Sequence, residues 1–426
     1  MKARPDFIGV GFFCSPTFAP MDSLTQIVLG AAVGEAVLGK KIGNRALYLG
    51  ALGGTIPDLD VLANVFTDEL TALAFHRGFM HGILFAVVAP FGLAWLTRRL
   101  YDSGTYRRPG FKWTLFLVLS LLLGAVLAGI NIIPAALSGR PVWWLAAGSL
   151  VLLLLFIRRL WTRYLHAELA EVSVSYQGWY WFWFATIFTH PLLDCFTTYG
   201  TQLFSPFSDY RVAFNTISVA DPLYTVPFGL SVITAGLLRR GSRARSWANA
   251  IGFTLSSAYL TFTVFNKHSV DRVFEQSLRR DGIAYTRYTT YPTIFNNLLW
   301  QGVAETPDGF YNGFYSKLDA VPEVARFYPW PKGHDLLIPY RDTRTVETLR
   351  WFSNDYYNVL PYNGDTLQLN DLRFGATVEP VEAPEDYVFK FLLWPEADGT
   401  LGMTQSRAGN FSEDRLVRFR DRVLGE

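Results

Sequence analysis

Histidine and aspartate residues lie near the ends of three apolar stretches of this sequence, and side chains of these two types could hold a metal ion. They are Asp58 and Asp60 in "TIPDLD", His76 and His81 in "HRGFMH", and His190 and Asp194 in "FTHPLLD". Imidazole nitrogens combined with carboxylate oxygens suit zinc well, and manganese or iron less specifically. Ionisable groups at a membrane edge are costly and by default indicate a functional site. We therefore predict a divalent metal site.

The spacing of the histidines restricts how they could converge. His190 and Asp194 are four residues apart, so they share one face of a helix. His76 and His81 are five residues apart, which is about 140° around an ideal helix. They could bind the same ion only if His76 lies in a loop, and Gly78 offers a place for the helix to break.

The carboxylates and Arg77 have further roles to share. Asp58 and Asp60 could be a ligand and its orienting partner, because ligating histidines usually need a carboxylate on the other ring nitrogen. In hydrolysis a free carboxylate would act as general base, and the sequence leaves Asp60 and Asp194 both open. Arg77 could neutralise an anionic substrate or a developing oxyanion, or it could simply pair with Asp58 or Asp60.

The elements that must position these groups are mostly transmembrane helices. Half of the 426 residues are hydrophobic and 17% are charged, against roughly 25% charged in soluble proteins. We predict a membrane α-helical bundle of about six to eight spans in 21–266, followed by a small β-rich or α+β domain in 267–426. Residues 1–20 are either an extension or precede the true start at Met21.

The apolar runs and the basic loops between them predict the topology. Full-length candidates are 79–97, 113–133, 142–157, 179–197, 222–238 and 247–265, and the shorter runs 24–38 and 46–57 are tilted helices or a re-entrant hairpin. Lysine and arginine gather in 39–45, 97–112, 158–163 and 238–246, and short basic loops stay cytoplasmic. This arrangement puts the six candidate ligands and the C-terminal domain outside the cytoplasm, in a multi-pass protein of a bacterial cytoplasmic (inner) membrane.

The C-terminal tail carries strand and turn signals. "GFYNGFYSKL" and "YVFKFLLW" predict strands, and "PDG", "YNGD" and "EADG" predict turns between strands. Because the basic residues lie in short loops between apolar runs, we expect no nucleic-acid partner. The partners expected are the lipid bilayer and an amphiphilic substrate, and no signal for an oligomeric state was found.

Four motifs in order give a resemblance to a known family. "MDSLTQIVLGAAVG", "IPDLD", "HRGFMH" and "THPLLDCFTTYGTQLFSP" resemble the motifs of the YdjM-type family of predicted membrane-bound metal-dependent hydrolases, over roughly residues 21–210. The tail, with "YPTIFNNLLWQGVAE", is similar to the C-terminal extension of longer relatives. The resemblance implies that the metal site consists of His76, His81, His190, Asp58, Asp60 and Asp194.

The chain departs from the family pattern in its first motif. Gln26 stands where many members have a histidine, and glutamine is a poor zinc ligand, so the first helix would supply only a hydrogen bond. Met80 replaces a small hydroxylated residue. With these changes the number of bound metal ions could be one or two. His268 follows the last span on the side of the site, where it could hydrogen-bond to a metal ligand or act as an interfacial anchor.

These observations predict an integral membrane metal-dependent hydrolase at the outer face of the membrane, acting on an ester or phosphoester of an amphiphilic or lipid substrate. The motifs HExxH, GxSxG and GxxxxGK[ST] are absent from the sequence. One alternative is a metal-ion or proton transporter that uses the same cluster, although transport sites usually lie near the bilayer midplane between repeats. The other is a non-catalytic membrane assembly protein in which metal only staples helices.

Overall fold

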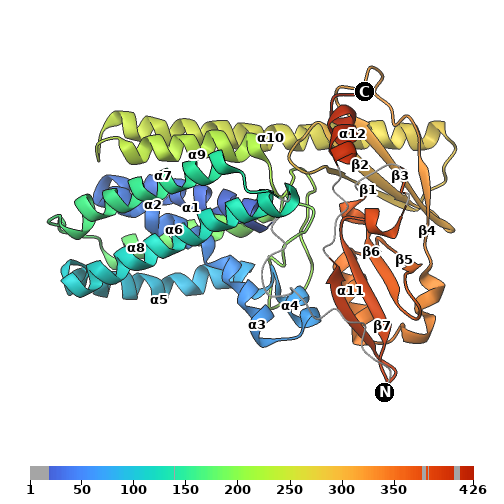
Figure 1. The fold of residues 1–426 in the computed structure, drawn as a ribbon, viewed down its shortest axis with the longest axis horizontal. Helices are drawn as coiled ribbons and strands as arrows, with labels where there is room; N and C mark the ends of the chain where they lie inside the picture. The colour runs from blue at the N-terminus through green and yellow to red at the C-terminus, as the bar shows by residue number, and fades with distance from the viewer. Residues whose placement is uncertain (1–18, 139, 377–379, 382, 407–412) are drawn as a thin grey trace.

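The structure is a computed structural model that describes residues 19–138, 140–376, 380–381, 383–406 and 413–426. It has an elongated helical part followed in sequence by a part built on two β-sheets (Figure 1). The expected N-terminal extension, 1–20, lies outside the described residues except for its last two positions.

The helical part consists of long helices that run side by side along the molecule (Figure 1). They are α1 (Ala19–Ile42), α2 (Asn44–Thr55), α5 (Ile83–Asp102), α6 (Pro109–Ser138), α7 (Trp143–Leu160), α8 (Tyr176–Asp194), α9 (Pro222–Leu237) and α10 (Arg243–Arg280). Glycines let α1 and α2 pack closely, since a Cβ added to Gly30 would lie 2.3 Å from the carbonyl oxygen of Gly50. The two short runs therefore form a tightly packed helix pair.

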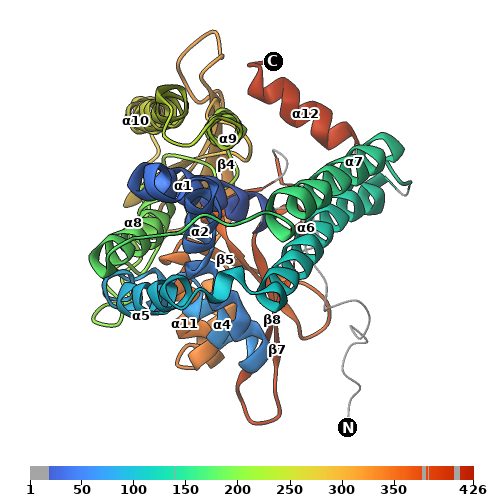
Figure 2. The same cartoon turned by 90° about the vertical axis from the view of Figure 1, so that its left-hand side faces the viewer.

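Three helices in the described part of the chain are long and apolar enough to cross a membrane: Ile83–Asp102, Pro109–Ile132 and Trp143–Leu165. The Pro222–Leu237 helix is apolar but shorter. The expected count of about six to eight spans is thus not confirmed. At 12 residues, α2 is about 18 Å long and too short to cross a hydrocarbon core of about 30 Å. Figure 2 shows α6 and α7 set apart from the group formed by α1, α2, α8, α9 and α10.

The span expected to begin at residue 79 begins later, at Ile83. Between α2 and α5 the chain forms short elements: η1 (Pro57–Leu62), α3 (Ala63–Phe66), α4 (Glu69–Phe75) and η2 (Phe79–His81). Gly82 has an extended backbone, with φ −75° and ψ 149°, and is the N-cap of α5. The histidine motif consequently lies before the helix and not within it.

The longest helix, α10, belongs to both parts of the molecule. It has 38 residues and continues without a break through position 266, the expected end of the membrane domain. Its first half packs on α9, and its second half contributes Val270, Phe274 and Leu278 to a core with Trp300 and Tyr315. The sheets therefore begin from a helix that is anchored among the other helices.

The C-terminal part contains two four-stranded antiparallel sheets, which confirms the β-rich prediction. The first is β1 (Arg287–Pro292), β2 (Leu299–Glu305), β3 (Gly309–Ser316) and β4 (Tyr328–Pro331), and the second is β5 (Tyr357–Pro361), β6 (Leu367–Asp371), β7 (Lys390–Pro395) and β8 (Leu401–Ser406). Neighbouring strands in each sheet follow in sequence order. Helices α11 (Arg344–Ser353) and α12 (Glu413–Val423) complete this part. The expected turns "PDG", "YNGD" and "EADG" all connect paired strands.

A second contact joins the sheets to the helices. Leu70 and Leu73 of α4 are buried in the same core as Leu349 and Phe352 of α11 and Val359 of β5. The short α4 thus packs into the second sheet region although it lies between α2 and α5 in sequence. This packing fixes the segment that carries His76 and His81.

Candidate metal centre

The ends of several helices bring polar side chains together where the helical part meets the sheets. The turn after α2 carries Asp58 and Asp60, the segment after α4 carries His81, and the last turns of α8 carry His190 and Asp194. His81, His190, Asp60 and Asp194 are buried. Three stretches far apart in sequence therefore meet in one buried polar cluster, as the sequence predicted.

Three donor atoms in this cluster form a compact triangle. The Nε2 atoms of His81 and His190 are 3.1 Å apart, and Asp58 Oδ1 lies 3.3 Å from His190 Nε2 and 3.7 Å from His81 Nε2. A tetrahedral zinc ion with bonds of about 2.0–2.1 Å would separate its ligand atoms by about 3.3 Å. Asp58, His81 and His190 consequently form a group that could hold a metal ion.

Charge and hydrogen bonding also fit a divalent cation. Three carboxylates and the guanidinium of Arg77 leave two net negative charges in the cluster when the histidines are neutral. Asp194 Oδ2 is buried without a hydrogen-bond partner, and it lies 3.3 Å from the Nε2 atom of each histidine. Because a buried charge must be paired, a dication at this position would satisfy groups that the protein alone leaves unbalanced.

The second nitrogen of each imidazole faces an acceptor. His190 Nδ1 is hydrogen-bonded to the carbonyl oxygen of Gly54, and His81 Nδ1 lies 3.2 Å from Asp60 Oδ2. The hydrogen bond to Gly54 fixes the tautomer of His190 and aims its Nε2 at a metal, whereas the contact of His81 with Asp60 is an ion pair without hydrogen-bond geometry. Both Nε2 atoms are directed to the same point.

Asp60 is surrounded by hydrogen-bond donors, so it is placed to orient His81 and not to bind a metal ion itself. His76 Nδ1 lies 2.9 Å from Asp60 Oδ1, and the backbone N–H of Arg77 donates to Asp60 Oδ2 at 2.8 Å. Helix α4 ends at Phe75, and Arg77 has a positive φ of 56°. The interruption expected near Gly78 is therefore confirmed. His76 reaches Asp60 and lies outside the Asp58, His81 and His190 group.

Arg77 pairs with a different carboxylate from the ones expected. Its Nε lies 3.4 Å from Asp194 Oδ2, and its Nη1 donates to Thr197 Oγ1 at 2.8 Å. Asp194 Oδ1 in turn accepts a hydrogen bond from Gln26 Nε2 at 2.8 Å. Gln26 thus supplies a hydrogen bond to the cluster, in the role expected from the first helix.

The pKa values of the groups outside the long helices reflect their burial and mutual contacts. Burial alone would raise the pKa of Asp58 and of Asp60. Interactions with His190 and His81 instead bring the pKa of Asp58 below its usual range. Interactions with His76 and His81 do the same for the pKa of Asp60. Burial opposes protonation of His81, yet its close contacts with the carboxylates of Asp194, Asp58 and Asp60 raise its pKa to about 9. Protons therefore compete with a metal for His81 at neutral pH.

Sequence reasoning missed the aromatic contacts above this cluster. The Tyr199 ring lies 5.2 Å from the His76 ring and 5.3 Å from the ring of Phe352 in α11, and the Arg77 guanidinium lies 5.0 Å from it. The signal available was the position of Tyr199 five residues after Asp194 in the same motif. His268, expected near the site, instead contacts Arg272 on α10.

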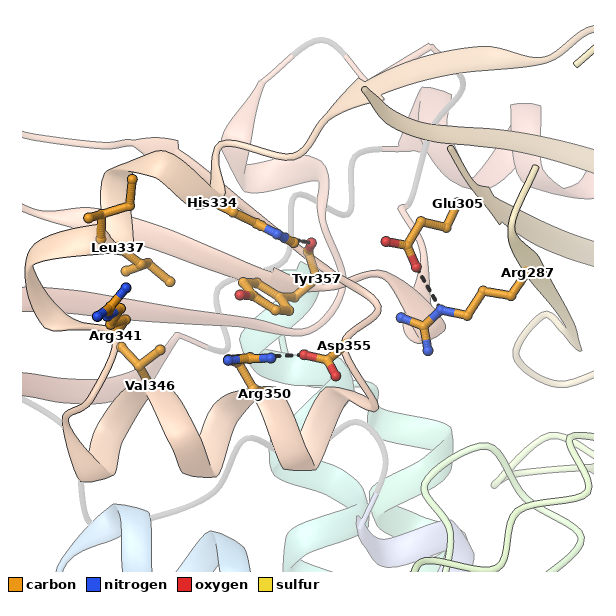
Figure 3. A pocket seen from close by; sticks show the side chains of 10 residues that line it. Arg287, Glu305, His334, Leu337, Arg341, Val346, Arg350, Asp355 and Tyr357 are labelled. Atoms are coloured by element: carbon orange, nitrogen blue, oxygen red, sulfur yellow. Dashed lines mark hydrogen bonds and ion pairs between the residues drawn. The ribbon is translucent and has the colours of Figure 1, made fainter. Parts of the chain in front are cut away.

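A hollow of about 460 Å³ between the two sheets differs from the His/Asp cluster in how its polar groups are paired (Figure 3). Arg287 pairs with Glu305 at 2.6 Å and Arg350 with Asp355 at 2.9 Å. His334 Nε2 donates to the carbonyl oxygen of Tyr357 at 2.9 Å. These charged and polar groups already have protein partners, so the hollow lacks the unbalanced chemistry of the His/Asp cluster.

Comparison with known proteins identifies relatives of the helical part. The sequence is 31% identical over 122 residues to a protein of Escherichia coli (strain K12) named inner membrane protein YbcI. That alignment covers 29% of this chain and 65% of the relative, so the chain spans slightly less than two thirds of that protein's length. No solved structure matches the chain. The family described as YdjM inner membrane protein matches residues 21–131 and 142–270, which is more than half of the sequence, and the chain belongs to this family.

Proposed function

We propose that this protein is an integral membrane metal-dependent hydrolase, acting at the outer face of the cytoplasmic membrane on an ester or phosphoester of an amphiphilic or lipid substrate. The observation that carries the proposal is the triangle of Asp58 Oδ1, His81 Nε2 and His190 Nε2, with separations of 3.1–3.7 Å. A site with three protein ligands leaves a position open for water or substrate, as catalytic zinc sites do.

In this proposal Asp58, His81 and His190 hold one divalent ion. Zinc is favoured by the mixture of nitrogen and oxygen donors and by the ligand separations, and manganese and iron are the alternatives. When bound, such an ion lowers the pKa of water towards neutrality and polarises the scissile group. Asp60 holds the His81 ring in position, and His76 and the Arg77 backbone hold Asp60.

Asp194 is the stronger candidate for the general base. Its Oδ1 is fixed by Gln26, whereas its Oδ2 has no hydrogen-bond partner and faces both imidazoles. Both oxygens of Asp60 face donors, so Asp60 has less capacity to accept a proton. Arg77, 3.4 Å from Asp194 Oδ2, would stabilise negative charge that develops on the substrate.

We further propose that α1, α8, α9 and the first half of α10 lie in the membrane beside the three candidate spans, which would give about six to eight crossing segments. The last turns of α1 and α7 carry Lys40, Lys41, Arg158 and Arg159, and α10 begins at Arg243, within the basic stretch 238–246. The ends that carry these residues point away from the sheets (Figure 1). The positive-inside rule then favours an extracytoplasmic domain at 267–426.

The decisive experiment measures the metal content of the purified protein and compares it with that of the His81→Ala and Asp194→Ala variants. We expect close to one equivalent of metal in the wild type, little in His81→Ala, and metal without hydrolysis in Asp194→Ala. A panel of lipid esters and phosphoesters then tests catalysis. If the purified wild-type protein contains no metal, the hydrolase proposal is refuted. If it contains metal and takes up cations into proteoliposomes, it is a transporter. If it contains metal but shows neither hydrolysis nor uptake, the metal has a structural role.

Sidedness needs a separate measurement. A cysteine placed on the sheets should react with a membrane-impermeant reagent added to intact spheroplasts. Protection of that cysteine until the membrane is broken would contradict the proposed topology.

A further inference from the structure

The His/Asp cluster is closed towards the sheets and reaches the surface on one side. The side chain of Asp58 is 21% exposed and that of His76 is 34% exposed, whereas those of His81, His190 and Asp194 are at most 1% exposed. On the side of the sheets, Tyr199 packs between His76 and Phe352. Access to the cluster therefore passes Asp58, at the start of η1.

The residues that follow Asp58 expose an unusual amount of apolar surface. The exposed apolar side chains of this stretch are Leu59, Val61, Leu62, Val65 and Phe66, and Phe66 is 82% exposed. The stretch 59–66 contains no lysine or arginine, and its one acid, Asp60, points into the cluster. Contiguous apolar surface of this kind on a protein marks an interaction site with another apolar phase.

A second apolar segment packs on the residues that directly follow His81. Phe204, Phe207, Tyr210 and Phe214 are exposed, and Phe207 is 83% exposed. The backbone N–H of Ile83, the first residue of α5, donates to the carbonyl oxygen of Leu203 at 2.9 Å. A Cβ added to Gly82 would lie 2.7 Å from the carbonyl oxygen of Ser205, so the segment packs directly on the start of this span.

Both segments lie close to the start of α5. Helix α5 is a candidate span, and Val88, Phe91 and Trp95 on it are exposed. The turn η1, which carries Leu59, Val61 and Leu62, packs against η2, which directly precedes α5. Apolar and aromatic side chains at the end of a span are typical of the boundary between headgroups and acyl chains. A lipid surface is therefore the partner that fits best.

We propose that residues 59–66 and 203–207 form an apolar edge that is inserted at the headgroup boundary of the outer leaflet, and that an amphiphilic substrate reaches Asp58 from the lipid along this edge. The insertion of the apolar edge does not depend on catalysis. The substrate route rests on the proposed hydrolase function. On this route the substrate is a molecule that stays in the membrane while its polar group reaches the site.

Spin labelling tests the insertion without any need for activity. Nitroxides are attached to Phe66→Cys and Phe207→Cys in a Cys14→Ser background, where Cys195 is buried, and the protein is reconstituted in vesicles of phosphatidylethanolamine and phosphatidylglycerol. Ile338→Cys, an exposed apolar position in the sheet part, is the matched control. We expect labels 66 and 207 to be more accessible to oxygen than to a nickel chelate, and label 338 to show the reverse.

Two results would overturn the insertion. Labels 66 and 207 could behave like label 338, which would place the edge in water. They could instead be protected from both reagents, which would mean that protein and not lipid covers the edge.

Substrate chain length tests the route. The double variant Val65→Asp with Phe66→Asp removes apolar surface outside the His/Asp cluster. We expect it to slow hydrolysis of a long-chain phosphoester by about tenfold or more, and to leave that of a short-chain soluble analogue unchanged. An equal loss for both substrates would overturn the lipid route. If wild type hydrolyses neither substrate, the hydrolase function and the route both fail, while the labelling result stands independently.

Discussion

Two buried charged clusters lie towards opposite ends of the same helices, and they differ in how their charges are matched. In the cluster remote from the sheets, Arg245 of α10 donates from Nε and Nη2 to the two carboxylate oxygens of Glu35 in α1, at 2.6 and 2.5 Å. Its Nη1 donates to Asn44 Oδ1 at 2.6 Å. Every charge in this pair has an opposite charge in bidentate geometry.

The His/Asp cluster is buried to a similar degree but lacks this balance. Two imidazole nitrogens face each other at 3.1 Å, and Asp194 Oδ2 has no hydrogen-bond partner. A matched pair fixes two helices to each other, whereas a cluster with three carboxylates and one guanidinium has an excess of negative charge that a cation can balance. The comparison teaches that the state of pairing, and not burial, distinguishes a structural cluster from a candidate binding site.

The largest expected effect is loss of metal from the His/Asp cluster. His190→Ala removes one of three proposed ligands, so we expect metal content to fall from about one equivalent to near zero. Metal analysis of the purified protein measures this. Glu35→Ala is the control, because its side chain lies in the matched pair, and it should retain metal. Full metal content in His190→Ala would contradict the proposed ligand set.

The second effect is on stability and belongs to the matched cluster. Glu35→Ala leaves the Arg245 charge buried without its partner, which should lower the free energy of unfolding by about 3–5 kcal/mol. Unfolding of the reconstituted protein by denaturant measures the change. Replacing both residues, as Glu35→Leu with Arg245→Met, should recover much of the loss. If the double replacement is as unstable as Glu35→Ala, unpaired charge is not the cause.

A smaller effect should come from the carboxylate that orients His81. Asp60→Asn keeps the size of the side chain but weakens its contacts with His76 and His81, and loss of such a partner costs about 10–100-fold in metal affinity. Competition with a chelator of known affinity gives the value. Asp102→Asn, in an exposed pair with Arg98, should have no effect. An unchanged affinity in Asp60→Asn would remove the orienting role.

The pH dependence of metal binding should be gradual, because it is spread over a range of pH. The pKa of His81 without metal is raised to about 9. Its proton must leave before Nε2 can bind an ion, so affinity should fall by about tenfold for each unit of pH below that value. It should level off above it. Metal titrations between neutral and alkaline pH test the slope, and a flat profile would show that His81 does not bind the ion.

Part of the cluster could be predicted from the sequence because helical periodicity is a local signal. The i, i+4 spacing placed His190 and Asp194 on one face, and the five-residue spacing with Gly78 predicted the break before His81. Both features are present in the structure. Strands were also predictable, as "GFYNGFYSKL" contains β3.

The division of roles within the cluster could not be predicted in the same way. Asp58 and Asp60 are two residues apart in a 3-10 turn, and only the paths of the neighbouring chains decide which one faces His190 and which one faces His76. Tyr199 is covered by Phe352, more than 150 residues later. Such contacts depend on tertiary packing, which a single sequence does not reveal.

The contacts between the sheets and the helices have a consequence for motion. One contact is the second half of α10 in the core with Trp300, and another is α4 in the core with Leu349. A third is the loop after α8, where the carbonyl oxygen of Thr216 accepts a hydrogen bond from Asn297 and the Arg211 guanidinium lies 5.0 Å from the ring of Phe352. Each added contact removes freedom of rotation, so the sheets are held in place above the cluster, and the α4 contact holds the segment that ends beside His76.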